Sequence, residues 1–242
     1  MTLKAKQEIE NADVVIGYKT YVKLIQQTIK PEVEVISGTM GQEVDRARTA
    51  ILKALEDKRV VVVSSGDSGV YGMAGVVLEV AEQQKANVQI EVVPGITAAT
   101  AAAATLGAPL VGDFAVISLS DILTPWNLIE KRLRAAAESD FVIALYNPQS
   151  KGRKEPLART HKILLDYRDP QTPVGIVKRA KREDEEFTIT SLAEMLTFEI
   201  DMATVVIIGN MATSMTNDRM ITARGYNLQS IAQQQKKQQA IR

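Results

Sequence analysis

The apolar residues of this chain form short continuous runs that alternate with helical stripes. Residues 59–65 are a β-branched run, typical of a strand buried on both faces of a parallel sheet. Residues 42–57 carry an apolar stripe at helical spacing. This alternation predicts an α/β fold with mostly parallel or mixed sheets and helices on both sides. We expect strands at 13–18, 32–36, 59–65, 88–93, 113–119, 141–146, 172–178, 186–190 and 204–208, and helices at 2–12, 20–29, 42–57, 70–84, 97–106, 126–139 and 155–168.

The strand and helix pattern starts again after a connector at residues 107–113. We therefore predict two α/β domains, at 1–111 and 112–228. Residues 229–242 are rich in glutamine and lysine and are predicted to be a polar tail.

The stretch 88–109 combines a short strand, the turn at Pro94 and Gly95, and a helix of very small side chains. Such a helix can lie very close to another backbone or to a flat ligand. Taken alone, the pattern favours a helix that packs on a sheet.

The amino-acid composition excludes several classes of functional site. The chain has 29 basic and 29 acidic residues, no cysteine and a single histidine. The absence of a basic excess argues against a nucleic-acid partner, and the residue types exclude zinc-ribbon, iron–sulfur and paired-histidine metal sites. No apolar run is long enough to span a membrane. We expect a cytoplasmic protein without a membrane partner.

Ligands of open parallel sheets bind at the carboxyl ends of the strands. Most of the expected strand ends carry glycine, or an Asn or Asp beside a turn residue, which favours a cleft with close backbone contacts. The loop after the strand at 59–65 is rich in glycine but lacks a phosphate-binding signature. Asp67 in that loop could accept hydrogen bonds from a ligand or could simply form the turn.

Several stretches, taken in order, resemble the tetrapyrrole methylases, the class III S-adenosylmethionine enzymes. They are Ser-Ser-Gly-Asp-Ser-Gly-Val-Tyr-Gly-Met-Ala-Gly (64–75), Val-Val-Pro-Gly-Ile-Thr-Ala-Ala (92–99), Ile-Ser-Leu-Ser-Asp-Ile-Leu-Thr-Pro-Trp (117–126), Leu-Tyr-Asn-Pro-Gln-Ser-Lys-Gly-Arg (145–153), Pro-Val-Gly-Ile-Val-Lys (173–178) and Thr-Val-Val-Ile-Ile-Gly-Asn (204–210). The third and fourth are similar to the branch that methylates ring carbon 17 of precorrin-3B or of its cobalt form.

The resemblance implies two α/β domains with S-adenosylmethionine in the cleft between them, and a homodimer. It implies methyl transfer to a corrinoid, coupled to ring contraction, on the route to cobalamin. The cofactor-binding residues that it implies are Gly66, Asp67, Pro94, Gly95, Thr97, Ala98, Ser118, Tyr146, Asn147, Val177 and Gly209.

The implied substrate carries several carboxylates, so cationic side chains near strand ends are candidate anchors. Candidate substrate-binding residues are Ser120, Asp121, Lys151, Arg153, Lys178 and Arg179. Methyl transfer needs alignment more than a strong acid or base, so no catalytic residue and no metal ligand is assigned.

One departure from the family matters. Its members begin with a strand and a Gly-x-Gly-Pro-Gly-Asp loop, whereas this sequence starts at the helix that follows them. We therefore expect the first sheet to lack one strand and the cleft to lack one loop. Two alternatives stay open: a methylase acting at another ring position, and a protein that only binds cofactor or tetrapyrrole.

Overall fold

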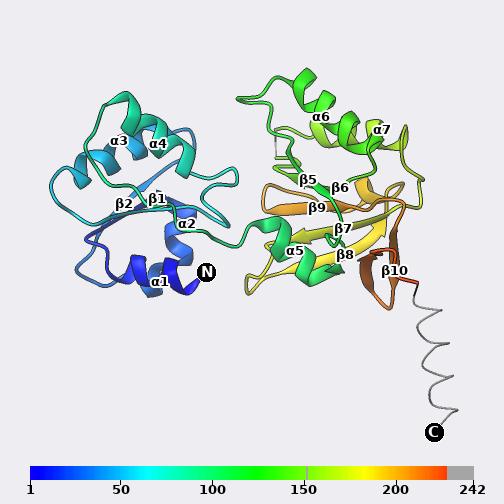
Figure 1. Ribbon diagram of the computed structural model, residues 1–242, viewed down its shortest axis with the longest axis horizontal. Coiled ribbons are helices and arrows are strands. Elements are labelled where there is room, and N and C mark those ends of the chain that lie inside the picture. The colour runs from blue at the N-terminus through cyan, green and yellow to red at the C-terminus, as the bar shows by residue number, and fades with distance from the viewer. Residues whose placement is uncertain (151, 228–242) are drawn as a thin grey trace, which may run out of the picture. The chain divides into compact units, whose positions relative to one another are not determined.

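The computed structural model describes residues 1–150 and 152–227 and divides the chain into two compact units (Figure 1). Unit 1 is Met1–Ala98 and unit 2 is Ala99–Arg242. The division falls earlier in the chain than the expected boundary near residue 111. The helix α5 (Ala98–Leu106), expected in the first domain, therefore belongs almost wholly to the second.

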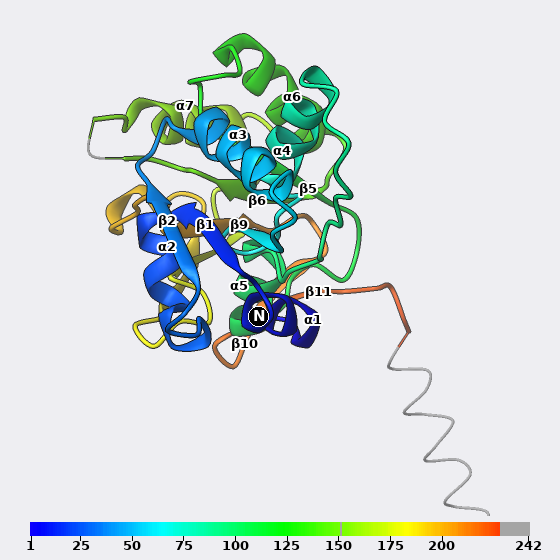
Figure 2. The same cartoon turned by 90° about the vertical axis from the view of Figure 1, so that its left-hand side faces the viewer.

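Unit 1 contains a parallel sheet in the order β2-β1-β3. Its strands are β1 (Val14–Tyr18), β2 (Glu34–Gly38) and β3 (Val60–Val63). Its helices are α1 (Leu3–Glu10), α2 (Lys19–Leu24), the short 3₁₀ helix η1 (Gln26–Thr28), α3 (Glu43–Ala54) and α4 (Ala74–Gln83). Figure 2 shows α3 and α4 on one side of the sheet and α1 and α2 on the other.

The central strand β1 explains this arrangement, because its side chains alternate between two apolar faces. Val15 is fully buried and packs in a cluster with Ile9 and Val22 from α1 and α2. Val14 and Ile16 are fully buried and pack with Ala50 from α3. A strand with no polar face is thus covered on both sides, as its apolar run predicts.

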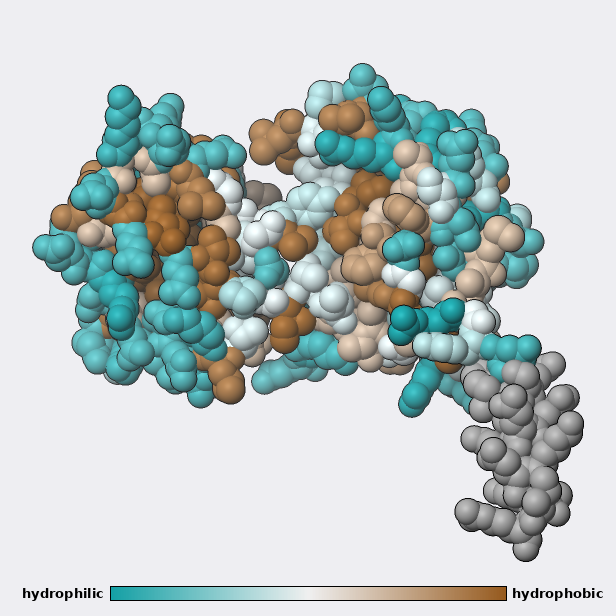
Figure 3. Space-filling model, viewed as in Figure 1, coloured by the Kyte–Doolittle hydropathy of each residue, from teal (hydrophilic) through white to brown (hydrophobic). Residues whose placement is uncertain are grey.

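The strand expected at 88–93 is absent, which corrects the prediction. Residues 88–93 join no ladder. Val88 and Ile90 pack against the α3–α4 cluster through their side chains. Among the described strands β3 pairs with β1 alone, and three of its four residues stay partly exposed. Residues 88–93 thus have the apolar pattern of a strand, but their backbone N–H and C=O groups are not paired with a neighbouring strand. Figure 3 shows hydrophobic surface on this unit.

Unit 2 contains a mixed sheet in the order β5-β6-β9-β7-β8. Its strands are β5 (Phe114–Ser118), β6 (Val142–Tyr146), β7 (Pro173–Lys178), β8 (Glu186–Ser191) and β9 (Thr204–Ile208). β5 and β6 are parallel, whereas β9 runs antiparallel to both β6 and β7, and β8 runs antiparallel to β7. β5, β6 and β7 consequently point in one direction.

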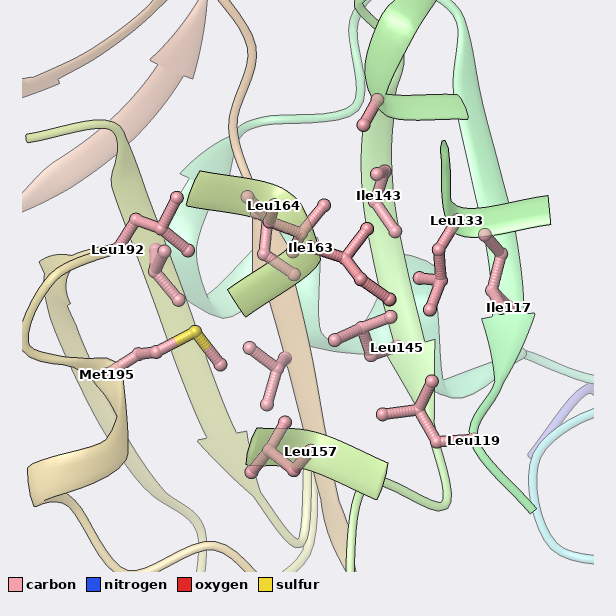
Figure 4. Packing of buried hydrophobic residues seen from close by; sticks show 14 of the residues in the cluster. Ile117, Leu119, Leu133, Ile143, Leu145, Leu157, Ile163, Leu164, Leu192 and Met195 are labelled. Carbon is pink, nitrogen blue, oxygen red and sulfur yellow. The ribbon is translucent and has the colours of Figure 1, made fainter. Parts of the chain in front are cut away.

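One face of this sheet is covered by α6 (Trp126–Glu138) and α7 (Glu155–Leu165), with the 3₁₀ helix η2 (Met195–Thr197) at its edge. Figure 4 shows Leu133, Ile143, Leu145 and Leu164 gathered in the core between these elements. All four are fully buried. This cluster is the largest apolar core of the chain's described part.

The small-residue helix α5 covers the opposite face. Val174 and Ile176 of β7 face the α6–α7 core, so Gly175 between them faces away from it. A Cβ on Gly175 would lie 2.2 Å from Cδ1 of the fully buried Leu106. The helix therefore packs directly on the strand backbone, as the pattern favoured, and this contact explains why α5 belongs to unit 2.

A second, small sheet was not predicted. It joins β4 (Gly107–Ala108), β10 (Thr213–Thr216) and β11 (Arg219–Thr222) in the order β10-β11-β4. Asn217 and Asp218, with φ values of 48° and 57°, form the tight turn between β10 and β11. The polar tail predicted at 229–242 lies outside the described residues.

Candidate functional site

The shared direction of β5, β6 and β7 brings their carboxyl ends to one edge of the unit 2 sheet. Ser118 is opposite Tyr146 in the β5–β6 pairing. Val177 and Lys178 end β7 at the same edge, where β9 begins with Thr204 opposite Lys178. Most of the unit 2 residues expected at the cofactor therefore gather at one end of the sheet.

Asn147 connects the loops at this edge. Its backbone has a φ of 51°, a left-handed conformation that asparagine adopts more readily than most residues. Its side chain Nδ2 donates to Ser118 Oγ at 2.9 Å, and the backbone N–H of Ser120 donates to the same oxygen at 3.2 Å. Ser118, Ser120 and Asn147 thus form one polar cluster.

Tyr146 links this cluster to the start of α5. Its hydroxyl oxygen accepts a hydrogen bond from the backbone N–H of Ala99 at 2.7 Å. The first N–H groups of a helix have no partner within the helix, so a side-chain acceptor here stabilises the helix start. Tyr146 thereby holds the beginning of α5 at the β6 end of the site.

Arg153, an expected substrate anchor, is engaged by the protein itself. Its Nη1 donates to the carbonyl of Leu119 at 2.5 Å and lies 3.4 Å from an Asp121 carboxylate oxygen. Its Nη2 donates to the carbonyl of Asn147 at 3.2 Å. The guanidinium thus ties the loop after β5 to the loop after β6.

Lys178 and Arg179 are also paired with carboxylates. Lys178 Nζ lies 3.3 Å from Asp201 Oδ2 and 3.5 Å from Glu199 Oε1. Arg179 contacts Asp184 at 2.6 Å and Glu186 at 2.7 Å. Both positive charges are neutralised by carboxylates of unit 2, and these ion pairs hold the β7 end in place. Lys151, the remaining candidate anchor, lies outside the described residues.

Lys178 and Asp201 shift each other's pKa. Burial opposes the charge of Lys178, but the two carboxylates outweigh it and raise its pKa. Burial likewise opposes the charge of Asp201, but hydrogen bonds from Thr204 Oγ1 and the Ala203 N–H, together with Lys178, lower its pKa. Both groups are therefore held in their charged forms.

Gly209 is not brought to this edge, because β9 runs antiparallel to β6 and β7. Ile208 at the end of β9 pairs with Ile143 and Val174 near the starts of their strands. A Cβ on Gly209 would lie 2.7 Å from the Thr213 Cβ, so the glycine permits close packing where the chain turns into β10. The expectation that Gly209 shares a strand-end edge with Tyr146 and Val177 is wrong.

In unit 1 the two glycine-containing loops lie against each other. A Cβ on Gly95 would lie 2.0 Å from the Gly66 carbonyl oxygen, so this approach requires glycine. The Asp67 carboxylate accepts hydrogen bonds from the N–H groups of Gly69 at 2.8 Å and Gly95 at 2.7 Å. Asp67 therefore fixes both loops, which favours its turn-forming role, with lone pairs remaining for a ligand.

Thr97 and Ala98 complete this corner of unit 1. Gly66 has a φ of 76°, and a Cβ there would lie 3.6 Å from the Ala98 N and 3.7 Å from the Thr97 Cα. The turn at Pro94 is held to the chain's start by Thr2 Oγ1, which donates to its carbonyl at 3.2 Å. Gly66, Asp67, Gly95, Thr97 and Ala98 are thus neighbours, as the resemblance implies.

Sequence reasoning missed one feature of unit 1. Arg46 is 6% exposed although it lies on a helix with ample solvent-facing positions. It lines a pocket of about 150 Å³ together with Tyr18, Tyr21 and Tyr71. The helical spacing could have predicted this burial, because Arg46 is four residues before Ala50 and shares the buried face of α3.

Among residues 1–150 and 152–227 no group of three or more His, Cys, Asp or Glu side chains is placed to hold a metal ion. In the same residues no helix has the length and apolar character needed to cross a membrane.

Comparison with known proteins adds independent information. The family model described as Tetrapyrrole (Corrin/Porphyrin) Methylases matches residues 1–196. Cobalt-factor III methyltransferase of Priestia megaterium is 50% identical over 230 residues, which cover 93% of this chain and 42% of that protein. This chain thus spans less than half of that relative's length.

Two further proteins match over nearly their whole lengths. The probable cobalt-factor III C(17)-methyltransferase of Salmonella typhimurium is 47% identical over 228 residues, which cover 94% of each chain. The crystal structure of the methyltransferase CobJ superposes with a TM-score of 0.85 at 37% identity, covering 92% of this chain and 93% of that one.

Proposed function

Because this chain belongs to the tetrapyrrole (corrin/porphyrin) methylase family, we propose that it transfers a methyl group from S-adenosylmethionine to ring carbon 17 of cobalt-factor III. In this proposal the transfer is coupled to ring contraction and serves cobalamin biosynthesis. The observation that carries it is the match to the Salmonella relative, which extends over nearly the whole of both chains.

The residues of both units suit this cofactor. In unit 1 the loops of Gly66 and Gly95 present backbone groups beside the small side chains of Thr97 and Ala98. In unit 2 the Ser118–Asn147 cluster and the backbone near Val177 present neutral donors and acceptors. Such groups match a ligand with an adenine, a ribose and an amino-acid end. We propose that these residues bind it.

S-adenosylmethionine supplies an electrophilic methyl group carried on a sulfonium. The chain's contribution is alignment, since holding two reactants in line can supply a large part of the barrier reduction. Arg153 and Asn147 hold the loops after β5 and β6 in a defined geometry. We propose that these loops, with Ser120 and Asp121, and the β7 end at Lys178 and Arg179 orient the substrate.

An assay with the purified chain tests this proposal. The chain is incubated with methyl-labelled S-adenosylmethionine and cobalt-factor III, and the product is analysed by mass spectrometry and NMR. A label at carbon 17 supports the proposal, and a label at another carbon supports a methylase of different ring position. Metal-free precorrin-3B, run in parallel, tests whether the substrate contains cobalt.

Calorimetric titration with S-adenosylhomocysteine separates the remaining outcomes. Binding without turnover of either substrate would indicate a protein that only binds its ligands. Absence of binding would contradict the cofactor assignment.

We also propose that the chain is a homodimer in the cytoplasm. The dimer is what the family resemblance implies, and a composition without cysteine is compatible with a reducing compartment. Size-exclusion chromatography with light scattering measures the mass directly, and a mass of one chain at micromolar concentration would contradict the dimer.

A further inference from the structure

A pocket in unit 1 opens at the carboxyl ends of its parallel strands. Tyr18 ends β1 and Val63 ends β3, and both line a cavity of about 150 Å³. Ligands of parallel sheets bind at this end. None of the site residues implied by the family resemblance lines this pocket, so it is a separate candidate site.

Arg46 is the only cation among the residues that line this pocket. Its Nη1 donates to the Thr39 carbonyl at 2.6 Å, and its Nη2 donates to Glu43 Oε1 at 3.1 Å. Its Nε is buried and has no hydrogen-bond partner among the described residues. Buried donors are almost always satisfied, so this N–H is a hydrogen-bond donor that the described residues leave unused.

The strand end beside Arg46 is shaped to hold it. A Cβ on Gly38, the last residue of β2, would lie 3.1 Å from Nη1, so a larger residue would crowd the guanidinium. Gln42 Oε1 accepts from the backbone N–H of Thr39 at 2.8 Å and orders the loop. The cation is therefore in place before any ligand arrives, which favours affinity.

The remaining lining is mostly neutral and aromatic. Tyr18, Tyr21 and Tyr71 are half of the six tyrosines in the chain. The rings of Tyr18 and Tyr21 meet edge to face with centroids 5.1 Å apart. Glu43 is the one carboxylate in the lining, and its side chain is 41% exposed at the rim.

We propose that this pocket binds a carboxylate side chain of the tetrapyrrole substrate, with Arg46 as its cationic partner. The inference rests on the proposed function. The volume is below the roughly 300–1,000 Å³ of sites that enclose a whole small molecule, so the pocket takes one arm of the macrocycle. A guanidinium suits a carboxylate, and the aromatic rings suit the adjoining pyrrole.

Binding of uroporphyrin to the full chain tests the proposal, with its methyl ester as the probe that lacks the charges. The variants are Arg46→Gln and Tyr71→Ala, of which the second keeps the buried charge and removes an aromatic ring of the lining that is 57% exposed. The matched control is Arg48→Gln, because Arg48 lies on the same helix, is 53% exposed and pairs only loosely with Asp45 at 3.8 Å. S-adenosylhomocysteine binding and a thermal melt report the fold of each variant.

We expect Arg46→Gln to weaken uroporphyrin binding about tenfold to a hundredfold, the loss of one hydrogen bond to a charged group. Tyr71→Ala should weaken it severalfold, because the pyrrole loses an aromatic contact, whereas Arg48→Gln should not change it. The ester should bind Arg46→Gln, Arg48→Gln and the wild-type chain equally. With cobalt-factor III, Arg46→Gln should raise KM by a similar factor and leave kcat nearly unchanged.

An unchanged uroporphyrin affinity in folded Arg46→Gln overturns the proposal. Should that variant not fold, an unchanged affinity in Tyr71→Ala overturns it instead. A wild-type chain that methylates cobalt-factor III but shows no charge-dependent uroporphyrin binding refutes the pocket alone. A wild-type chain that binds uroporphyrin through Arg46 but transfers no methyl group refutes the proposed function alone.

Discussion

Replacing Gly175 by alanine should push helix α5 away from the unit 2 sheet. The new Cβ would lie 2.2 Å from Leu106 Cδ1, 2.8 Å from Cδ2 and 3.0 Å from Cγ. Carbon atoms that are not bonded prefer separations of about 3.5–4.0 Å. Leu106 has no room to retreat, because it is fully buried. The helix or the strand must therefore move.

The size of the effect follows from the packing. Overfilling a core costs about 1–3 kcal/mol. Alanine restricts the unfolded chain more than glycine does, which offsets about 0.4–1 kcal/mol of this loss. Leu106→Ala alone should cost about 2–5 kcal/mol, because it leaves a cavity. In the double variant the atoms that collide are gone, so its loss should be smaller than the sum by at least about 1 kcal/mol.

Urea unfolding monitored by tryptophan fluorescence measures these differences, since the single tryptophan, Trp126, begins α6 in unit 2. Gly112→Ala is the matched control, because no heavy atom lies within 4 Å of its Cβ position. It should change stability by less than about 0.5 kcal/mol. Additive losses in Gly175→Ala and Leu106→Ala, within about 0.5 kcal/mol, would show that the two side chains do not meet and would refute this account of α5.

Three further predictions concern the edge of the unit 2 sheet. Tyr146→Phe should lower stability by about 0.5–1.5 kcal/mol, because the N–H of Ala99 loses its acceptor, and weaken S-adenosylhomocysteine binding in calorimetry. Arg153→Gln should weaken that binding more than Arg159→Gln does, because only Arg153 ties two site loops; equal effects would contradict its positioning role. The pKa of Asp201 lies below its ordinary value of 3.8, so its carboxylate adds stability that is present above about pH 4 and lost as the pH falls through the lower folded-state pKa. Asp201→Asn should flatten this part of the acid-unfolding profile, and an identical profile in both proteins would disprove the assignment.

The local patterns of the chain predicted most elements of the fold. The apolar stripe at 42–57 became α3, and the β-branched run at 59–65 contains β3. The spacing of the apolar residues and the length of the segment predict such elements, because an apolar face must be buried whichever element it packs against. The motif stretches likewise identified the family, which the comparisons support independently.

Strand direction was beyond the reach of these patterns. A β-branched strand buries its side chains equally well whether it runs parallel or antiparallel to its neighbour. The direction of β9 is set by its pairing with β6 and β7, and this pairing places Gly209 far along the sheet from Tyr146. Gly209 was therefore identified correctly as the end of a strand but grouped with the wrong end of the sheet.

The partners of the charged candidate residues likewise could not be predicted from the sequence. Charge and position mark Arg153, Lys178 and Arg179 as possible anchors, but their partners come from distant stretches or from turns whose path is set by the fold. The pocket around Arg46 also depends on three strand ends meeting.

The sequence by itself determined most of the helices and strands, because burial periodicity is a local property, but it predicted a strand at 88–93 that is absent and missed β4, β10 and β11. It also determined the family, through motifs that need no geometry. Only the tertiary structure decided that residues 88–93 join no ladder, that α5 packs on Gly175 and that Arg46 lines a pocket. Each of these depends on what a segment finds beside it, and neighbours distant in sequence are chosen by the packing of the whole chain.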